Sequence, residues 1–243
     1  RQLIMKFSNL VRVYTTDSIA KNQTIIIDAE CFHYLKSVMR LKLSAEFRLF
    51  NASDGEFLVE VTMVNRSSLE VCVQEFLRPV IQGRQLTLAM CIIKPDRMLE
   101  TIRAAVQLGV TNIVPIISKR TQYKDVNRDR IEKSIIQSIT QSERFIPPVL
   151  SDPVSLEKFV KADDFGQVIL ASETESEDNK ISNISKFKEE VSVLIGPEGG
   201  FSDDEINLLK THKHITAVSL GQAVLRAEIA AITALAYVAM VRD

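Results

Sequence analysis

Cysteine is scarce in this chain, which holds only Cys31, Cys72 and Cys91 among 243 residues. The three are scattered, odd in number and lack Cys-x-x-Cys spacing. This pattern argues against a disulfide framework and a zinc site, and it favours a reducing compartment.

Long apolar runs are missing as well. No segment approaches the roughly 20 residues that a membrane-spanning helix needs. The first residues, Arg1 to Phe7, lack the apolar stretch of a signal peptide. We therefore expect a cytoplasmic protein with no membrane partner.

Charge of one sign is not in excess, because 30 lysines and arginines face 31 acidic residues. The protein has no overall positive potential that would indicate a nucleic-acid partner, so any RNA contact must use a local basic patch. Apolar residues make up 46% of the chain, which is enough for the core of one large domain or two modest ones.

The first part of the chain is rich in short β-like segments. We expect strands at Leu10–Tyr14, Gln23–Ile27, Phe47–Phe50, Phe57–Val64 and Leu69–Phe76, with a hairpin turn at Asp54-Gly55 and one helix at Ala29–Met39. This pattern predicts a small β-barrel over residues 1–79.

After Pro79 and Gly83 the periodicity changes, which places a domain boundary near residue 80. Strands are expected at 86–93, 113–117, 167–171, 191–195 and 216–220, and helices at 97–108, 128–144, 154–160, 203–211 and 223–241. Such alternation predicts an α/β domain over residues 80–243 with a mainly parallel sheet. Ligands of these sheets bind at the carboxyl ends of the strands.

One strand end carries the segment IGPEGGFSDDE, residues 195–205. Its three glycines let the backbone approach a ligand closely, and Ser202 or Asp203 can cap the following helix. The spacing equally allows a tight turn without a ligand. The segment is neither a phosphate-binding P-loop nor a dinucleotide-binding GxGxxG motif.

A second segment, SLGQAVLRAE at residues 219–228, also runs from a strand through glycine into a helix. Arg226 and Glu228 are expected in the first turn of that otherwise apolar helix, where charges need partners or solvent. They are candidate functional groups, although a structural ion pair would also explain them.

Together, IGPEGGFSDDEI and LGQAVLRAE resemble the two signature segments of the bacterial 16S ribosomal RNA uracil-N3-methyltransferase family, a branch of the SPOUT superfamily. Further matches are HYLKSVMRLK at 33–42, KPDRMLE at 94–100 and LGVTNIVPIIS at 108–118. The order and spacing agree over nearly the whole chain.

This resemblance implies a SPOUT domain with a C-terminal trefoil knot, an N-terminal PUA-like RNA-binding barrel and a homodimer without metal. It implies S-adenosylmethionine as cofactor and 16S ribosomal RNA or the 30S subunit as partner. By the same resemblance, the cofactor-binding residues are Leu170, Ile195, Gly196, Pro197, Glu198, Gly199, Gly200, Leu220, Gly221, Val224 and Leu225.

Three positions depart from the family pattern. Ala223 and Ile229 stand where relatives usually have arginine and threonine, and Gln107 stands where glutamate is common. The missing arginine removes a possible contact to substrate or cofactor, whereas Arg226 and Glu228 are retained.

The reaction implied by the resemblance assigns roles to the two retained residues. Uracil N3 is a poor nucleophile until its proton leaves, so a group must accept that proton or stabilise the uracil anion. Arg226 is the candidate anion stabiliser, and Glu228 either orients it or acts as the base.

RNA contacts require local positive charge. The candidates are Arg12, His33, Arg40 and Lys42 in the barrel, and Lys94, Arg97, Lys119, Arg120 and Arg144 in the larger domain.

Other functions remain compatible with the sequence. One is a SPOUT enzyme with another acceptor, such as a ribose 2′-hydroxyl, and another is a non-catalytic RNA-binding assembly factor. A nucleotide-dependent α/β enzyme is less compatible, because no phosphate-loop lysine is present.

Overall fold

A computed structural model describes residues 6–28, 32, 35, 41–162 and 164–242. Two compact units divide the chain. The first, called here the β unit, comprises Arg1–Gln82 and Ile139–Ile146, and the second, the α/β unit, comprises Gly83–Ser138 and Pro147–Asp243. The β unit therefore includes a segment from far along the chain, which the linear boundary near residue 80 does not anticipate.

The β unit contains one five-stranded sheet in the order β1-β3-β4-β5-β2. Its strands are β1 (Arg12–Tyr14), β2 (Thr24–Asp28), β3 (Glu46–Asn51), β4 (Gly55–Val64) and β5 (Ser68–Arg78). β1 pairs with β3 in parallel, and the other pairs are antiparallel. The predicted hairpin is confirmed, since β4 begins at Gly55 and returns along β3. The predicted helix Ala29–Met39 lies outside the described residues except for Phe32 and Leu35.

Alternating side chains build the core of the β unit. In β5, Leu69, Val71 and Val73 are completely buried, whereas the residues between them are only half-buried. This period of two is the expected pattern for a strand with one face on the core.

The α/β unit contains a parallel sheet in the order β12-β10-β11-β6-β7-β8, with β9 paired to β7. Its strands are β6 (Leu86–Cys91), β7 (Asn112–Ile117), β8 (Val149–Leu150), β9 (Val154–Ser155), β10 (Gln167–Ala171), β11 (Val191–Ile195) and β12 (Ile215–Val218). Its helices are α3 (Pro95–Gln107), α4 (Arg128–Gln141, whose last turn lies in the β unit), α5 (Leu156–Ala162), α6 (Asp203–Thr211) and α7 (Ala227–Arg242), with short 3-10 turns at Glu177–Asn179 and Ile181–Asn183.

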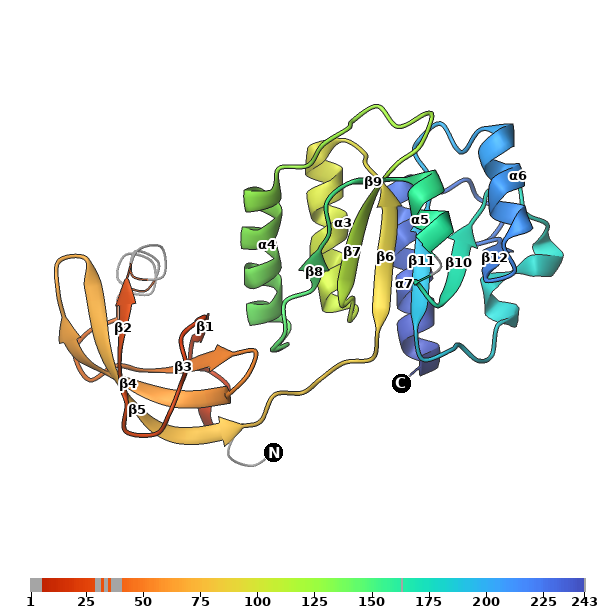
Figure 1. The fold of residues 1–243 in the computed structure, drawn as a ribbon. Coiled ribbons are helices and arrows are strands. Elements are labelled where there is room, and N and C mark those ends of the chain that lie inside the picture. The colour runs from red at the N-terminus through yellow and green to blue at the C-terminus, as the bar shows by residue number, and fades with distance from the viewer. Residues whose placement is uncertain (1–5, 29–31, 33–34, 36–40, 163, 243) are drawn as a thin grey trace. The chain divides into compact units, whose positions relative to one another are not determined.

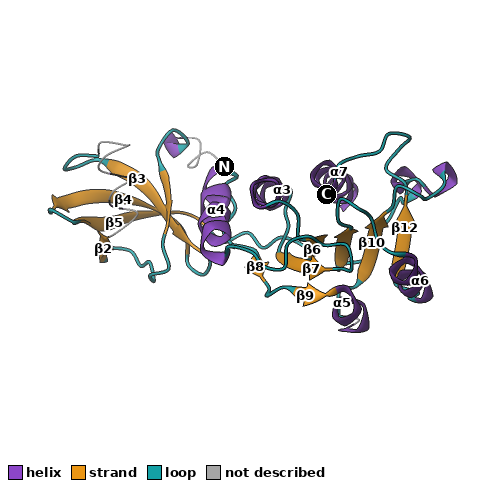
Figure 2. Cartoon of the chain, turned by 90° about the horizontal axis from the view of Figure 1, so that it is seen from above, coloured by secondary structure: helices purple, strands orange, loops and turns teal. Residues whose placement is uncertain are grey.

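Helices cover both faces of this sheet. Figure 2 shows α3 and α7 on one face and α5 and α6 on the other. The strands between them are apolar on both faces, and all five residues of β11 are buried. The prediction of an α/β unit with a parallel sheet is confirmed.

Several predicted boundaries are wrong for identifiable reasons. The segment predicted as a helix from Val154 starts with the short strand β9, because tertiary pairing with β7 recruits its first two residues. The helix predicted to reach Arg144 ends at Gln141, since Glu143 adopts a left-handed conformation with φ of 59°. The last helix begins at Ala227 rather than Ala223, and β8 was not predicted at all.

No helix within the described ranges is long and apolar enough to cross a membrane.

Candidate active site at the carboxyl edge of the parallel sheet

Three loops follow the adjacent strands β10, β11 and β12. Because the three strands are parallel neighbours, their carboxyl ends meet at one edge of the sheet (Figure 1). Both signature segments lie there, one after β11 and one after β12. The edge is therefore the location that the sheet topology favours for a ligand.

The loop after β11 has a tight turn. The amide of Gly200 donates to the carbonyl oxygen of Pro197 at 2.9 Å. Gly200 has φ of +66°, a conformation that side chains other than glycine rarely adopt. The second half of the turn thus requires glycine at this position.

A capping box starts the helix that follows. The side chain of Ser202 accepts the amide of Glu205, and the Glu205 carboxylate accepts the amide of Ser202. The same carboxylate accepts the backbone amide of Lys119 at 2.7 Å, which ties the loop after β7 to the start of α6. Predicted capping by Ser202 is confirmed.

Arg120 forms hydrogen bonds with the glycine loop, residues 196–201 after β11. Its Nη1 donates to the carbonyl oxygens of Gly199 at 2.8 Å and Phe201 at 3.3 Å. The neighbouring Lys119 pairs through Nζ with Asp204 at 2.6 Å, which raises the pKa of the lysine through that hydrogen bond. Both predicted RNA-binding cations therefore also contact the loop and helix that form the site.

Arg97 joins the two signature segments. Its Nη1 lies 3.1 Å from Oε1 of Glu198 in the glycine loop, and its Nε lies 3.7 Å from Oε1 of Glu228. The Glu228 side chain is only 12% exposed. Its second oxygen, Oε2, is buried and has no hydrogen-bond partner within the described part of the protein. A buried carboxylate oxygen of this kind is an acceptor available to a ligand.

The loop before α7 ends at Arg226. The Arg226 carbonyl accepts the amide of Ala230 at 2.8 Å, so Arg226 is the N-cap of α7 and not part of its first turn. The Arg226 side chain is exposed, and its guanidinium forms no ion pair with Glu228 among the residues described. Hydrogen bonding between Gly221 and Ser219 shapes the start of this loop.

The other predicted cofactor residues divide by exposure. Leu170, Ile195 and Pro197 are buried. Gly196, Leu220 and Leu225 are half-buried, and the more exposed members are Glu198, Gly199, Gly221 and Val224. The carboxyl edge thus combines buried apolar side chains with loop residues whose backbone is exposed.

The remaining predicted RNA-binding residues are dispersed. Lys42 and Lys94 are exposed, and Arg144 is half-buried with its pKa lowered by burial. His33 and Arg40 lie outside the described residues. Arg12 is buried in the β unit.

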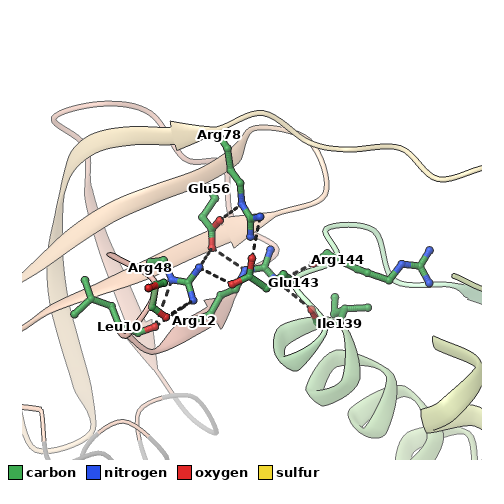
Figure 3. A network of polar contacts seen from close by, with 9 residues as sticks. Leu10, Arg12, Arg48, Glu56, Arg78, Ile139, Glu143 and Arg144 are labelled. Carbon is green, nitrogen blue, oxygen red and sulfur yellow. Dashed lines mark hydrogen bonds and ion pairs between the residues drawn. The ribbon is translucent and has the colours of Figure 1, made fainter. Parts of the chain in front are cut away.

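Arg12 belongs to a buried ion-pair network (Figure 3). Glu56 is fully buried and accepts Nε of Arg12 at 2.7 Å and Nε of Arg78. Arg48 lies 3.5 Å from Glu56 and 3.0 Å from Glu143, which also pairs with Arg78 at 3.0 Å. Nε and Nη1 of Arg12 are bonded to protein partners, whereas its Nη2 is buried without a partner among the described residues. The burial of this side chain favours a structural role over RNA binding.

The contacts of Arg97 and Arg120 with the glycine loop were not predicted from the sequence. Both follow the carboxyl ends of strands in the parallel sheet, and this placement was the available signal. In the described ranges, no group of three or more histidine, cysteine or acidic side chains has the arrangement of a metal site.

Comparisons with known proteins identify the family to which the chain is related. Residues 82–239 match the family model of the RNA methyltransferase domain, and residues 27–73 match that of the RNA methyltransferase PUA domain. The chain is 38% identical over 230 residues to the Ribosomal RNA small subunit methyltransferase E of Rickettsia conorii, covering 93% of this chain and 94% of the relative.

Solved structures share the fold. A methyltransferase of Legionella pneumophila with its bound cofactor SAM is 28% identical, with a TM-score of 0.86 and coverage of 95% of this chain and 97% of that one. The Ribosomal RNA small subunit methyltransferase E of Neisseria gonorrhoeae has a TM-score of 0.82 at 24% identity, covering 94% and 96%, and supports the fold alone.

Proposed function

Because the chain belongs to the RNA methyltransferase family, we propose that it transfers a methyl group from S-adenosylmethionine to N3 of one uridine in 16S ribosomal RNA. The orphaned buried oxygen of Glu228, beside two exposed loops at the carboxyl edge, carries this proposal. The SAM-bound relative from Legionella supports the choice of cofactor.

The residues at the edge fit this cofactor. Leu170, Ile195, Leu220 and Leu225 offer apolar contact for an adenine ring, and the backbone of residues 196–200 offers hydrogen-bonding groups. We assign Gly196, Pro197, Glu198, Gly199, Gly200, Gly221 and Val224 to the same site. When bound, S-adenosylmethionine supplies an electrophilic methyl group on a sulfonium.

Glu228 and Arg226 carry the proposed chemistry. S-adenosylmethionine would supply the methyl group from its sulfonium sulfur, and the proton on uracil N3 would pass to an acceptor on the protein. Glu228 is that acceptor, because its Oε2 is buried and has no hydrogen-bond partner within the described part of the chain. Arg226 stabilises the negative charge that develops on the uracil oxygens.

Arg97 is a positioning residue in this scheme. Its contacts with Glu198 and Glu228 hold the glycine loop and the start of α7 in one arrangement. In this proposal Glu228 pairs with Arg97 and acts as the base, which is one of the two roles expected for it; the other was to orient Arg226.

RNA is held by local charge in this proposal. Lys42 and Lys94 are exposed candidates. Arg97, Lys119 and Arg120 at the carboxyl edge are further candidates, and so is Arg144 in the β unit. His33 and Arg40 remain candidates from the family resemblance. We assign residues 1–79 to a PUA-like RNA-binding domain and residues 80–243 to a methyltransferase domain that also contributes RNA contacts, and we place the protein in the cytoplasm.

Two further features of the proposal concern architecture. The chain near Asn179 and Ile181 pairs with Ser219, which is compatible with a knotted C-terminal segment. Val224, Ile229 and Met240 are exposed apolar side chains at or near α7, with exposed fractions of 78%, 46% and 78%. They suit a homodimer, which light scattering of the purified protein would test.

The decisive experiment maps nucleosides by mass spectrometry. Small-subunit RNA and assembled subunits from a strain lacking the protein are incubated with protein and S-adenosylmethionine. We expect 3-methyluridine at one site. Methylation of a ribose would identify a different acceptor, and no methylation on either substrate would favour a non-catalytic binding factor.

Variants then test the residue roles. We expect Glu228→Gln to lower kcat at least 100-fold while leaving S-adenosylmethionine affinity within a few fold. Glu100→Gln, an exposed carboxylate change on α3, is the control. Full activity of Glu228→Gln or of Arg226→Ala would refute the role assigned to that residue.

A further inference from the structure

A basic hollow lies at the opposite edge of the parallel sheet. Its volume is about 340 Å³, and it is lined by Gln167, Lys186, Phe187, Lys188, Lys213, His214 and Thr216. Gln167 begins β10, and His214 immediately precedes β12. The hollow therefore lies at the amino ends of these strands, whereas the candidate active site lies at their carboxyl ends.

The lining carries positive charge without a carboxylate. Lys186, Lys188 and Lys213 are exposed, and none of the three forms an ion pair within the described part of the chain. Lys119 and Lys161, in contrast, each pair with an acidic side chain. Three uncompensated lysines in one concavity produce a local positive potential in a protein whose total charge is close to zero.

The backbone that carries these lysines is well supported. The side chain of Gln167 accepts the amide of Lys188 at 3.1 Å. The half-buried ring of Phe187 lies edge-to-face against Tyr237, with centroids 6.2 Å apart, and Tyr237 donates to the carbonyl oxygen of Ile184 at 3.0 Å. Hydrogen bonding and ring packing thus fix the segment that carries Lys186 and Lys188.

Acidic groups nearby belong to other surroundings. Glu190 lines a separate hollow together with Asp164. Glu189 follows Lys188 and is exposed, but it is not among the residues that line the basic hollow. Neither carboxylate lines the basic hollow.

We propose that this hollow binds phosphodiester groups of the RNA substrate, at a contact separate from the active site. Compact lysine cations without fixed partners suit phosphate oxygens, and they read charge rather than base sequence. The ring of Phe187 adds an apolar wall for a sugar or base. This inference rests on the proposed RNA substrate, and it predicts that RNA extends past both edges of the sheet.

The test compares two triple variants of equal net charge in the full chain. Lys186, Lys188 and Lys213 are changed to glutamine in one, and the exposed Lys158, Lys161 and Lys210 on α5 and α6 are changed to glutamine in the other. Binding to small-subunit ribosomal RNA is measured by fluorescence anisotropy over 50–200 mM salt. Cofactor affinity and thermal midpoint are measured to establish that both variants are folded.

We expect the slope of log affinity against log salt to become less negative by about 2 in the hollow variant, since each neutralised phosphate contributes roughly 0.7 for single strands. At 100 mM salt this corresponds to roughly 100-fold weaker binding. The control variant keeps the slope of the unmodified protein.

Equal slopes for the hollow variant and the unmodified protein would overturn the inference, as would equal losses in both variants. Saturable binding of inorganic pyrophosphate to the hollow without any change in RNA affinity would also overturn it, because the ligand would then be a small anion. Absence of 3-methyluridine with the unmodified protein would instead refute the proposed reaction. The salt dependence of RNA affinity could still be measured and would test the hollow separately.

Discussion

Glu56 is the fully buried carboxylate at the centre of the ion-pair network of the β unit. Its carboxylate has no exposed surface and accepts hydrogen bonds from Nε of Arg12 and Nε of Arg78, and Arg48 lies 3.5 Å away (Figure 3). Glu56→Gln keeps the shape but replaces one oxygen by an amide group, which cannot accept a guanidinium N–H. The change leaves two buried arginines without their principal counter-charge.

The size of the effect follows from burial. Desolvation lowers the pKa of Arg12 to about 10, and Glu56 is the main group that opposes this shift. Removing one partner of a buried ion pair costs about 3–5 kcal/mol, because a charge stays buried without compensation. Arg12 keeps its bonds to the carbonyls of Ile139 and Arg144, so we expect a loss near 3 kcal/mol.

Glu143→Gln provides the matched control in the same network. Glu143 also contacts two arginines at 3.0 Å, but 42% of its side chain is exposed, so solvent screens both pairs. The hydrogen bond from Arg48 and the charge of Arg78 outweigh burial and hold the pKa of Glu143 below its ordinary value. We expect this variant to lose about 1 kcal/mol or less.

Hydrogen exchange followed by mass spectrometry measures both variants locally. The readout is the opening free energy of peptides from β3, β4 and β5, which separates the β unit from the rest of the chain. A loss below about 1 kcal/mol for Glu56→Gln, or equal losses for the two variants, would refute the reasoning from burial.

Three further predictions concern separate positions. Gly166 has φ of +64° and an added Cβ would lie 2.3 Å from the carbonyl oxygen of Glu190, so Gly166→Ala should cost about 2 kcal/mol or more and lower Tm by roughly 4–8 °C in calorimetry. Burial raises the pKa of the Cys91 thiol to about 11. Iodoacetamide at pH 8 should therefore modify Cys91 more slowly than a free thiol, which peptide mass spectrometry measures. Alkylation of Cys91 at the rate of a free thiol would contradict this prediction. The hydrogen bond from Asn51 lowers the pKa of Asp54 below 3.8 in the folded protein. The ionised carboxylate therefore stabilises the fold fully above pH 3.8, and this contribution is lost as the pH falls through the folded pKa. An NMR titration that gives Asp54 a pKa of 3.8 or more would contradict the prediction.

Local patterns predicted much of the fold. The alternation of Leu69, Val71 and Val73 defines β5, and the apolar run of Val191–Ile195 defines a strand covered on both faces. Such patterns are visible in sequence because each residue's burial repeats with the period of its own element. The boundaries were less predictable, since the N-cap at Arg226 and the pairing of β9 with β7 depend on neighbours distant along the chain.

The candidate site divides in the same way. The glycine loop and Ser202 cap were readable from composition and spacing, and the family resemblance identified both signature segments. The contacts of Arg97 with Glu198 and Glu228 could not be derived locally, because three separate strand ends bring these residues together.

By itself, the sequence determined the succession of strands and helices, the change of architecture near residue 80 and the residue types at the carboxyl edge. Tertiary structure alone decided which charges meet. It placed Ile139–Ile146 in the β unit and left one oxygen of Glu228 buried without a partner. The physical reason is range: backbone periodicity acts between near neighbours, whereas desolvation and ion pairing depend on what the completed fold places around each charge.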